Sequence, residues 1–327
     1  MIPNKIKLKH KLKELLNKNS DKKIFVKRIK DVEPIHLAPS RNFDVYRVSV
    51  LIKKQSEKKN EGLDLVLKRL KPHHPQTDFS NLRDRSHREI TDLPAYTEQL
   101  FKYLQGPINN GTKEGYLVRF YGKHGSDIFE EYAGDISVER LFMEKTPDSK
   151  LLERIVVAIA DEHSKWSTNM GSYIDLLSNI RKEENFSKKL QDNLAFILKD
   201  DEENLTSSET EILNKFFNGI ESYFKDESFN IFIRLIHSDL HLGHIFLKYD
   251  NLKYSSMVEM SKEDLKKYNP EIKIVDVTGM SIGPRTFDLV DILKHPVAIN
   301  ADEYPTKDAQ RKLIENLVEL YRVKLFE

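Results

Sequence analysis

Ionisable side chains gather at the ends of two apolar runs in the second half of the chain. The run Ile231–Ile236 leads into His-Ser-Asp at residues 237–239, and a second apolar run begins at Ile245. Asp276 ends a similar apolar sequence, IKIV. Buried ionisable groups are costly unless they are paired or bind a ligand. Carboxylates and imidazoles at the exits of two buried strands are suited to proton transfer and to binding a metal ion.

The segment His237–His244, HSDLHLGH, resembles the H-G-D-x-x-x-x-N catalytic loop of the aminoglycoside phosphotransferase superfamily. Asp276 in IVDVTG is similar to that family's second aspartate, and Gly283–Leu289 resembles the segment that follows it and includes Asp288. Parts of this sequence pattern also resemble motifs of maltokinases and of methylthioribose kinases. Such motifs indicate a function only in combination and in the right order.

Further pieces of the pattern precede this loop in the family's order. Residues 40–48, SRNFDVYRV, are similar to the nucleotide loop, and Lys68 in LVLKRL matches the phosphate-contacting lysine. Residues 127–134, DIFEEYAG, resemble the strand that enters the interlobe hinge, and Ile155–His163 resembles a helix ending in Leu-His. The resemblance covers about residues 36–292, and an ordered series is far more specific than one motif.

The resemblance implies a kinase that transfers the γ-phosphate of ATP to an alcohol group. Phosphoryl transfer depends on positioning and on neutralising phosphate charge. Asp239 would orient the acceptor hydroxyl and take its proton. Asp276 and His244 would hold Mg²⁺, with Mn²⁺ as the other candidate ion.

Nucleotide binding is expected from the N-terminal part of the pattern. Lys68 would contact the α- and β-phosphates and would be held by a carboxylate on the following helix, Glu89 or alternatively Glu98. The remaining nucleotide-binding residues lie in the nucleotide loop and, through backbone atoms alone, at the hinge: Ser40, Asn42, Glu130 and Tyr132.

The chain departs from the family pattern at the metal position and in the nucleotide loop. His244 replaces the usual Asn, as in macrolide phosphotransferases, and imidazole suits transition metals better than Mg²⁺. The alternative is that His244 is only hydrogen-bonded. The loop sequence LAPSR at residues 37–41 lacks glycine, so backbone amides approach phosphate less freely. His237 is expected to brace the loop, and His241 either faces substrate or caps the turn.

Two regions of the chain, which differ in the spacing of their apolar residues, would position these residues. Residues 32–133 read as strands, with a long hairpin turn at Lys53–Gly62 and a helix over Leu82–Leu104 that Pro94 breaks or kinks. After Gly134 the apolar spacing is helical, over 150–166, 187–199, 207–224 and 307–326. The sequence therefore predicts an α+β, two-lobed, protein-kinase-like fold, with a β-rich nucleotide-binding lobe at 32–133 and a mostly helical lobe at 134–327 that carries the catalytic loop and acceptor site.

Residues 1–31 form a basic amphipathic segment. Its first 30 residues hold ten lysines and Arg28 against Glu14 and Asp21. The leucines fall on one stripe of a helix: Leu8, Leu12, Leu15 and Leu16. We expect a solvated helix that docks this stripe on the protein body. The alternative is a basic arm that anchors the kinase to RNA or to an anionic membrane.

Composition narrows the classes of function. The 53 Lys and Arg nearly cancel the 52 Asp and Glu, which argues against a general nucleic-acid binder. The absence of cysteine excludes disulfides and a catalytic thiol, and no apolar run approaches the roughly 20 residues of a membrane span.

We expect a cytoplasmic protein whose partners are ATP and a small-molecule acceptor, a sugar, a sugar-like metabolite or an antibiotic. Trp166 and Tyr173 are the aromatic candidates for an acceptor platform. The alternative function is a nucleotide-binding pseudokinase or regulatory module without turnover.

Overall fold

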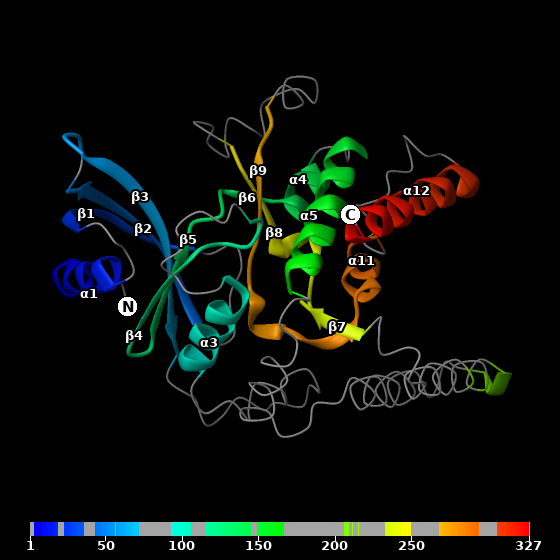
Figure 1. Ribbon diagram of the computed structural model, residues 1–327, viewed down its shortest axis with the longest axis horizontal. Coiled ribbons are helices and arrows are strands. Elements are labelled where there is room, and N and C mark those ends of the chain that lie inside the picture. Colours follow the sequence, from blue (N-terminus) through cyan, green and yellow to red (C-terminus); the bar gives the residue numbers. More distant parts are fainter. Residues whose placement is uncertain are drawn as a thin grey trace.

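The computed structural model describes residues 3–18, 23–35, 43–55, 57–71, 93–105, 115–144, 149–166, 206–208, 211, 215, 233–249, 268–293 and 306–326. Figure 1 shows an antiparallel sheet on one side of the molecule and helices on the other, with short strands between them. This arrangement is the predicted α+β architecture of two lobes.

The N-terminal lobe is built on one five-stranded sheet. Its strands are β1 (Ile24–Pro34), β2 (Phe43–Lys54), β3 (Glu61–Leu70), β4 (Phe120–His124) and β5 (Asp127–Glu131). They pair antiparallel in the order β1-β2-β3-β5-β4. The turn expected at 53–62 joins β2 to β3. Because side chains alternate along a strand, Ile128 and Phe129 of strand β5 enter different apolar clusters on the two faces of the sheet.

Helix α1 (Lys5–Lys18) covers one face of this sheet (Figure 1). Its four stripe leucines are 0–6% exposed, and they pack with Val26, Val48 and Phe129 among others. The predicted docking of the leucine stripe is confirmed. Strand β1 begins at Ile24 and spans the expected segment boundary at residue 31, so the basic segment continues directly into the sheet.

Helix α3 (Leu93–Gln105) packs against β4, where the rings of Phe101 and Phe120 stack with centroids 4.8 Å apart. Pro94 lies in the first turn of α3, where its missing N–H costs nothing. The break or kink predicted at this residue stays a prediction. The expected helical residues 82–92 lie outside the described part of the chain.

The chain leaves the N-terminal sheet at Gly134. Its φ is 124°, and a Cβ there would lie 2.5 Å from the carbonyl oxygen of Leu247. Only glycine permits both this dihedral angle and this close approach of two backbones.

The C-terminal lobe combines helices with two small sheets, ordered β6-β8-β9 and β10-β7. In chain order the elements are β6 (Ile136–Ser137), α4 (Val138–Glu144), α5 (Ser149–Trp166), β7 (Ile233–Ile236), the 3₁₀ helix η4 (Leu242–His244), β8 (Ile245–Lys248), β9 (Glu271–Ile274), the 3₁₀ helix η5 (Val277–Gly279), β10 (Ser281–Pro284), α11 (Thr286–Leu293) and α12 (Lys307–Phe326).

Helices α5 and α12 lie against each other and contribute buried residues to the core of this lobe (Figure 1). Their bounds agree with the helices predicted at 150–166 and 307–326. The predicted helix 187–199 lies outside the described residues, as does most of 207–224. None of the described helices is long and apolar enough to cross a membrane.

Candidate active site

The segment His237–His244, which we call the catalytic loop after the family motif that it resembles, follows strand β7. Strand β7 pairs with β10, which fixes where this segment begins. Ser238 has a φ of 61° and Asp276 a φ of 62°, the two non-glycine residues with positive φ in the described chain. Both lie at the predicted site, where strained backbone is typical. The turn at Ser238 leaves the side chain of Asp239 exposed, as a group that accepts a proton from substrate requires.

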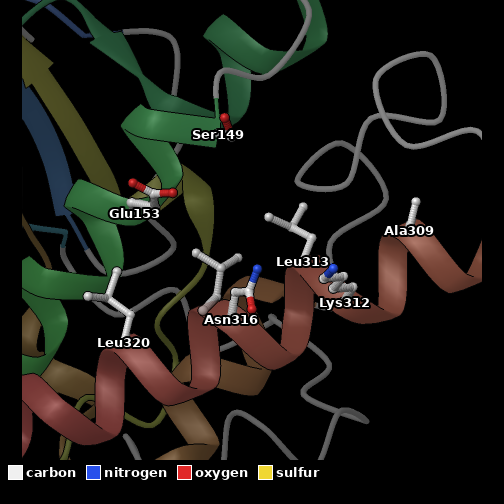
Figure 2. Close-up of a pocket in the computed structure, with 8 residues that line it drawn as sticks. Ser149, Glu153, Ala309, Lys312, Leu313, Asn316 and Leu320 are labelled. Atoms are coloured by element: carbon white, nitrogen blue, oxygen red, sulfur yellow. The ribbon is translucent and has the colours of Figure 1, made fainter.

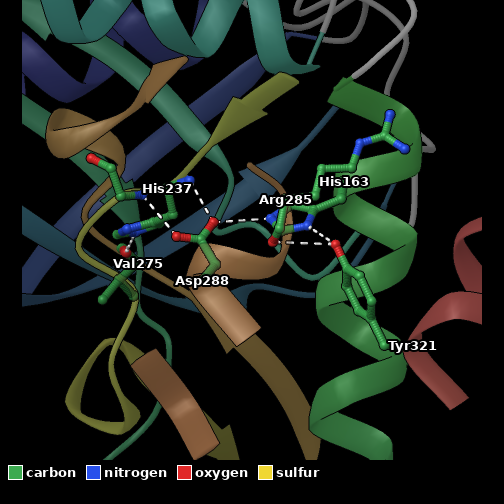
Figure 3. Close-up of polar contacts among 7 residues, drawn as sticks. His163, His237, Val275, Arg285, Asp288 and Tyr321 are labelled. Carbon is green, nitrogen blue, oxygen red and sulfur yellow. Dashed lines mark hydrogen bonds and ion pairs between the residues drawn. The ribbon is translucent and has the colours of Figure 1, made fainter. Parts of the chain in front are cut away.

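Asp288 binds the start of the loop through two hydrogen bonds (Figure 3). Its carboxylate, 0% exposed, accepts the backbone N–H of His237 at 2.6 Å and that of Ser238 at 2.8 Å. The side chain of His237 adds a bond between Nε2 and the carbonyl of Val275, at 2.9 Å. The residues directly before Asp239 are therefore tied to α11 and to the end of β9. The bracing role expected of His237 has this geometry.

A buried chain of polar groups continues from Asp288 to the two long helices (Figure 3). His163 Nε2 lies 2.9 Å from Asp288 Oδ2, and His163 Nδ1 lies 2.6 Å from the hydroxyl of Tyr321. An imidazole that donates through Nε2 accepts through Nδ1, so the tyrosine hydroxyl donates to His163. Burial raises the pKa of Tyr321 and keeps this hydroxyl protonated.

Lys68 and Asp276 bring charges of opposite sign together from the two lobes. Lys68 Nζ lies 2.9 Å from Glu130 Oε2, and both side chains are largely buried. Burial opposes the charge of Lys68, but the carboxylates of Glu130 and Asp276 hold its pKa above the ordinary value. Burial also raises the pKa of Asp276, but the charge of Lys68, the nearby His244 and the hydrogen bond from Thr278 together outweigh it, so this pKa lies well below its usual range. Asp276 is therefore an anion at neutral pH.

His244 lies between the two aspartates. Its Nδ1 is 2.8 Å from the carbonyl oxygen of Asp239, and its Nε2 is 3.9 Å from Asp276 Oδ2. The bond at Nδ1 places the proton there and leaves a lone pair on Nε2. Burial, with a smaller contribution from His237, lowers the pKa of His244 to about 4. The imidazole is neutral at pH 7 and presents a ligand atom toward Asp276.

His241 caps the 3₁₀ helix η4. Its Nδ1 accepts the N–H of Gly243 at 3.1 Å, and its ring lies against that of His244, with centroids 3.8 Å apart and the planes tilted by 39°. Two roles were expected for His241, facing substrate or capping the turn. Its described contacts are those of a cap.

Only some of the residues predicted to bind nucleotide lie in the described part of the chain. Ser40, Asn42 and Glu89 lie outside the described residues. Glu98 lies on α3 and pairs with Lys102 of the same helix at 3.2 Å, whereas the described partner of Lys68 is Glu130 on β5. The side chain of Glu130, which had no predicted role, thus supplies the counter-charge that a buried lysine on the neighbouring strand requires.

The hinge side chains also carry contacts that the sequence does not reveal. Tyr132 donates a hydrogen bond to Asp135, and the Arg47 guanidinium lies 4.3 Å from the centroid of its ring. The backbone N–H of Tyr132 points to the carbonyl of Asp64 at 3.4 Å.

Of the aromatic candidates for an acceptor platform, Trp166 is 3% exposed and packs beside His163, with ring centroids 5.3 Å apart. Trp166 is thus a core residue, because the apolar side of α5 faces inward. Tyr173 lies outside the described residues.

Sequence reasoning missed Tyr321 altogether and did not assign a contact to His163. The resemblance of Ile155–His163 to a helix ending in Leu-His singled out His163 without giving it a contact. No local sequence pattern links His163 to Asp288 or to a tyrosine on α12.

A separate cavity of about 500 Å³ lies between α5 and α12 (Figure 2). Its lining combines apolar and polar side chains: Ser149, Glu153, Ala309, Lys312, Leu313, Asn316, Leu317 and Leu320. None of the predicted site residues lines it, so this cavity is distinct from the catalytic loop.

The strand order β1-β2-β3-β5-β4, with helix α3 before β4 and a helical lobe after β5, defines the architecture. The chain has a two-lobed, protein-kinase-like fold. No protein-family model and no curated protein matches this sequence.

Solved structures to which this chain is similar include a phosphotransferase and two proteins described as kinases. The GDP complex of aminoglycoside 2'-phosphotransferase-IIIa is 15% identical, with 99% of this chain and 88% of that chain covered and a TM-score of 0.46. A putative fructosamine-3-kinase from Thermobifida fusca is 13% identical, with 97% and 95% covered and a TM-score of 0.44. An ethanolamine kinase from Plasmodium vivax is 13% identical, with 90% and 72% covered and a TM-score of 0.44. The roles of individual residues in this kinase-like chain rest on their own contacts.

Proposed function

We propose that this protein is an ATP-dependent phosphotransferase that acts on a hydroxyl of a small molecule, a sugar, a sugar-like metabolite or an antibiotic. The observation that carries the proposal is the convergence of charge from both lobes. Lys68 on the N-terminal sheet faces the anionic Asp276, and His244 connects Asp276 to the loop that displays Asp239. A cation, an anion and an exposed carboxylate in this order fit a phosphoryl donor and a hydroxyl acceptor.

Each residue has one task in the transfer. Asp239 accepts the proton of the acceptor hydroxyl while that oxygen forms its bond to the γ-phosphorus. The bond between the γ-phosphorus and its bridging oxygen breaks, and the electron pair leaves with ADP. Lys68 stabilises the negative charge on the α- and β-phosphates. The bonds from Asp288 keep Asp239 in place while the proton moves.

The donor set at His244 and Asp276 fits a divalent cation. The two ligand atoms lie 3.9 Å apart, a separation that one ion can bridge with bonds of about 2.1 Å. Mg²⁺ held there would neutralise charge on the nucleotide phosphates. The nitrogen ligand favours Mn²⁺ more than an amide oxygen would, so both ions are candidates.

The test of the catalytic role is Asp239→Asn. ATP consumption is measured against a panel of sugars, nucleosides and antibiotics, and the active acceptor is used to compare variants. We expect turnover to fall by roughly 10²-fold or more while nucleotide affinity stays near that of the wild type. The matched control is Asp308→Asn, an exposed aspartate on α12. Unchanged turnover in Asp239→Asn would remove Asp239 from this role.

The test of the metal role is Asp276→Ala, followed by calorimetry with Mg·ATP. We expect Mg²⁺-dependent nucleotide binding to be lost, because the variant removes the only carboxylate at the proposed metal position. The same affinity in variant and wild type would contradict the assignment.

A second candidate function is a nucleotide-binding regulatory module without turnover. The observation that favours it is that the described partner of Lys68 is Glu130 on β5, and not a carboxylate on the helix after β3 as the resemblance to active kinases implies. Tight Mg·ATP binding combined with no turnover on the whole panel would favour this second function.

A further inference from the structure

A second set of ligand atoms overlaps the catalytic loop. Asp239, His241 and His244 offer one oxygen and two nitrogens that all lie within 4.8 Å of one another. The three residues follow the short pattern D-x-H-x-x-H. Residues three apart nearly eclipse in a 3₁₀ helix, so η4 places the two imidazoles against each other. Local chain geometry alone therefore assembles this cluster.

We propose that Asp239, His241 and His244 form a site for a borderline-soft divalent cation such as Zn²⁺, occupied when no nucleotide is bound. Two imidazoles and one carboxylate are a common donor set for zinc and one that Mg²⁺ seldom uses. Ligand atoms of a tetrahedral zinc site lie about 3.4 Å apart. The cluster reaches that spacing through side-chain rotation, since Asp239 is exposed and both histidines are half-buried.

The hydrogen bonds of the two histidines determine how each can coordinate. The carbonyl of Asp239 accepts from His244 Nδ1 and orients the lone pair of Nε2, the usual arrangement behind a metal-bound imidazole. In His241 the lone pair on Nδ1 accepts from Gly243, so coordination through His241 costs that hydrogen bond. Asp276 Oδ2, 3.9 Å from His244 Nε2, adds negative charge beside the ion.

The bound ion has a consequence for the proposed phosphotransferase. It occupies the carboxylate of Asp239, which can then no longer accept a proton, and it takes His244 from the nucleotide-bound cation. Zinc would therefore inhibit turnover. This consequence rests on the proposed function, whereas zinc binding by the triad does not.

The binding experiment uses the nucleotide-free full chain and a chromophoric zinc chelator as competitor. We expect wild type to hold a zinc equivalent that a large excess of Mg²⁺ does not displace. His241→Ala should weaken this equivalent by about tenfold or more, with the variant shown to be folded by circular dichroism. His124→Ala, which removes an imidazole on β4 beside Glu14, is the matched control and should change nothing. Equal zinc binding in His241→Ala and His124→Ala would overturn the site.

The inhibition experiment adds Zn²⁺ to the enzyme with its active acceptor and with Mg·ATP well below saturation, so that nucleotide-free enzyme is present. We expect inhibition in the wild type and a shift of at least tenfold to higher zinc concentration in His241→Ala. Inhibition of the same strength in both would place the ion elsewhere and overturn the proposal. If the panel yields no turnover, the proposed function fails, and the binding experiment alone decides the zinc site.

Discussion

Helix α1 and the catalytic loop are both rich in charged or ionisable residues, yet they are held in place in different ways. Helix α1 is fixed by a stripe of leucines, and its lysines remain on the outside apart from Lys11, which pairs with Asp127 at 2.7 Å. The catalytic loop is fixed by directional bonds to one buried carboxylate, Asp288. Apolar contact tolerates small shifts, whereas hydrogen bonds to backbone N–H groups set the position of Asp239 closely.

The largest effect is expected from removing the carboxylate of Asp288, which holds the catalytic loop in place. Asp288→Ala leaves two buried N–H groups and His163 without their acceptor, so we expect the free energy of unfolding to fall by about 3–5 kcal/mol. Chemical denaturation measures this change. Asp288→Asn, which keeps one carbonyl oxygen, should lose less. A loss under about 1 kcal/mol in Asp288→Ala would show that the loop does not depend on this carboxylate.

The leucine stripe that fixes helix α1 can be disrupted at Leu12, which is 0% exposed. Leu12→Ala should lower the free energy of unfolding by about 3 kcal/mol, from lost burial and the cavity left behind. Ile6→Ala, at a position 71% exposed, is the control and should stay within about 0.5 kcal/mol. If the two regions are as separate as their contacts indicate, Leu12→Ala should leave the kcat of the folded enzyme unchanged.

A pH titration sharpens the comparison, because His244 in the loop has its pKa lowered to about 4. An unfolded histidine titrates near 6.5, so between these values the unfolded state binds a proton that the folded state does not. Stability should therefore fall as pH drops from about 6.5 to about 4. His244→Asn should show a smaller fall over this window in urea unfolding series. Parallel curves for the two proteins would contradict the lowered pKa.

The smallest effect is expected at Ser238, where a non-glycine residue has a φ of 61°. Ser238→Gly relieves the steric cost of the left-handed conformation and should raise stability by up to about 1 kcal/mol. Differential scanning calorimetry would detect the rise in Tm. A fall in Tm would show that the serine side chain contributes more than the strain costs.

The sequence predicted those parts of the molecule that depend on local periodicity. The leucine stripe of α1, the hairpin of β2 and β3, and the bounds of α5 and α12 all follow from spacing along the chain.

The supports of the site were not predictable in the same way. The bonds of Asp288 join positions 50, 51 and 125 residues away, and that between His163 and Tyr321 spans 158 residues. Such pairs leave no periodic trace. The Lys68–Glu130 pair is likewise a cross-strand contact, created by the register of β3 against β5.

The link from the catalytic loop through Asp288 and His163 to Tyr321 has a consequence for how the protein is made. A ribosome delivers the chain from its N-terminus, so the sheet and α1 can assemble while later segments are still being synthesised. The loop, in contrast, gains its last support only when α12 has been completed and has docked on α5. A nascent chain lacking α12 would therefore carry a finished N-terminal sheet but an unsupported loop, so phosphate-handling competence would be acquired late in biosynthesis.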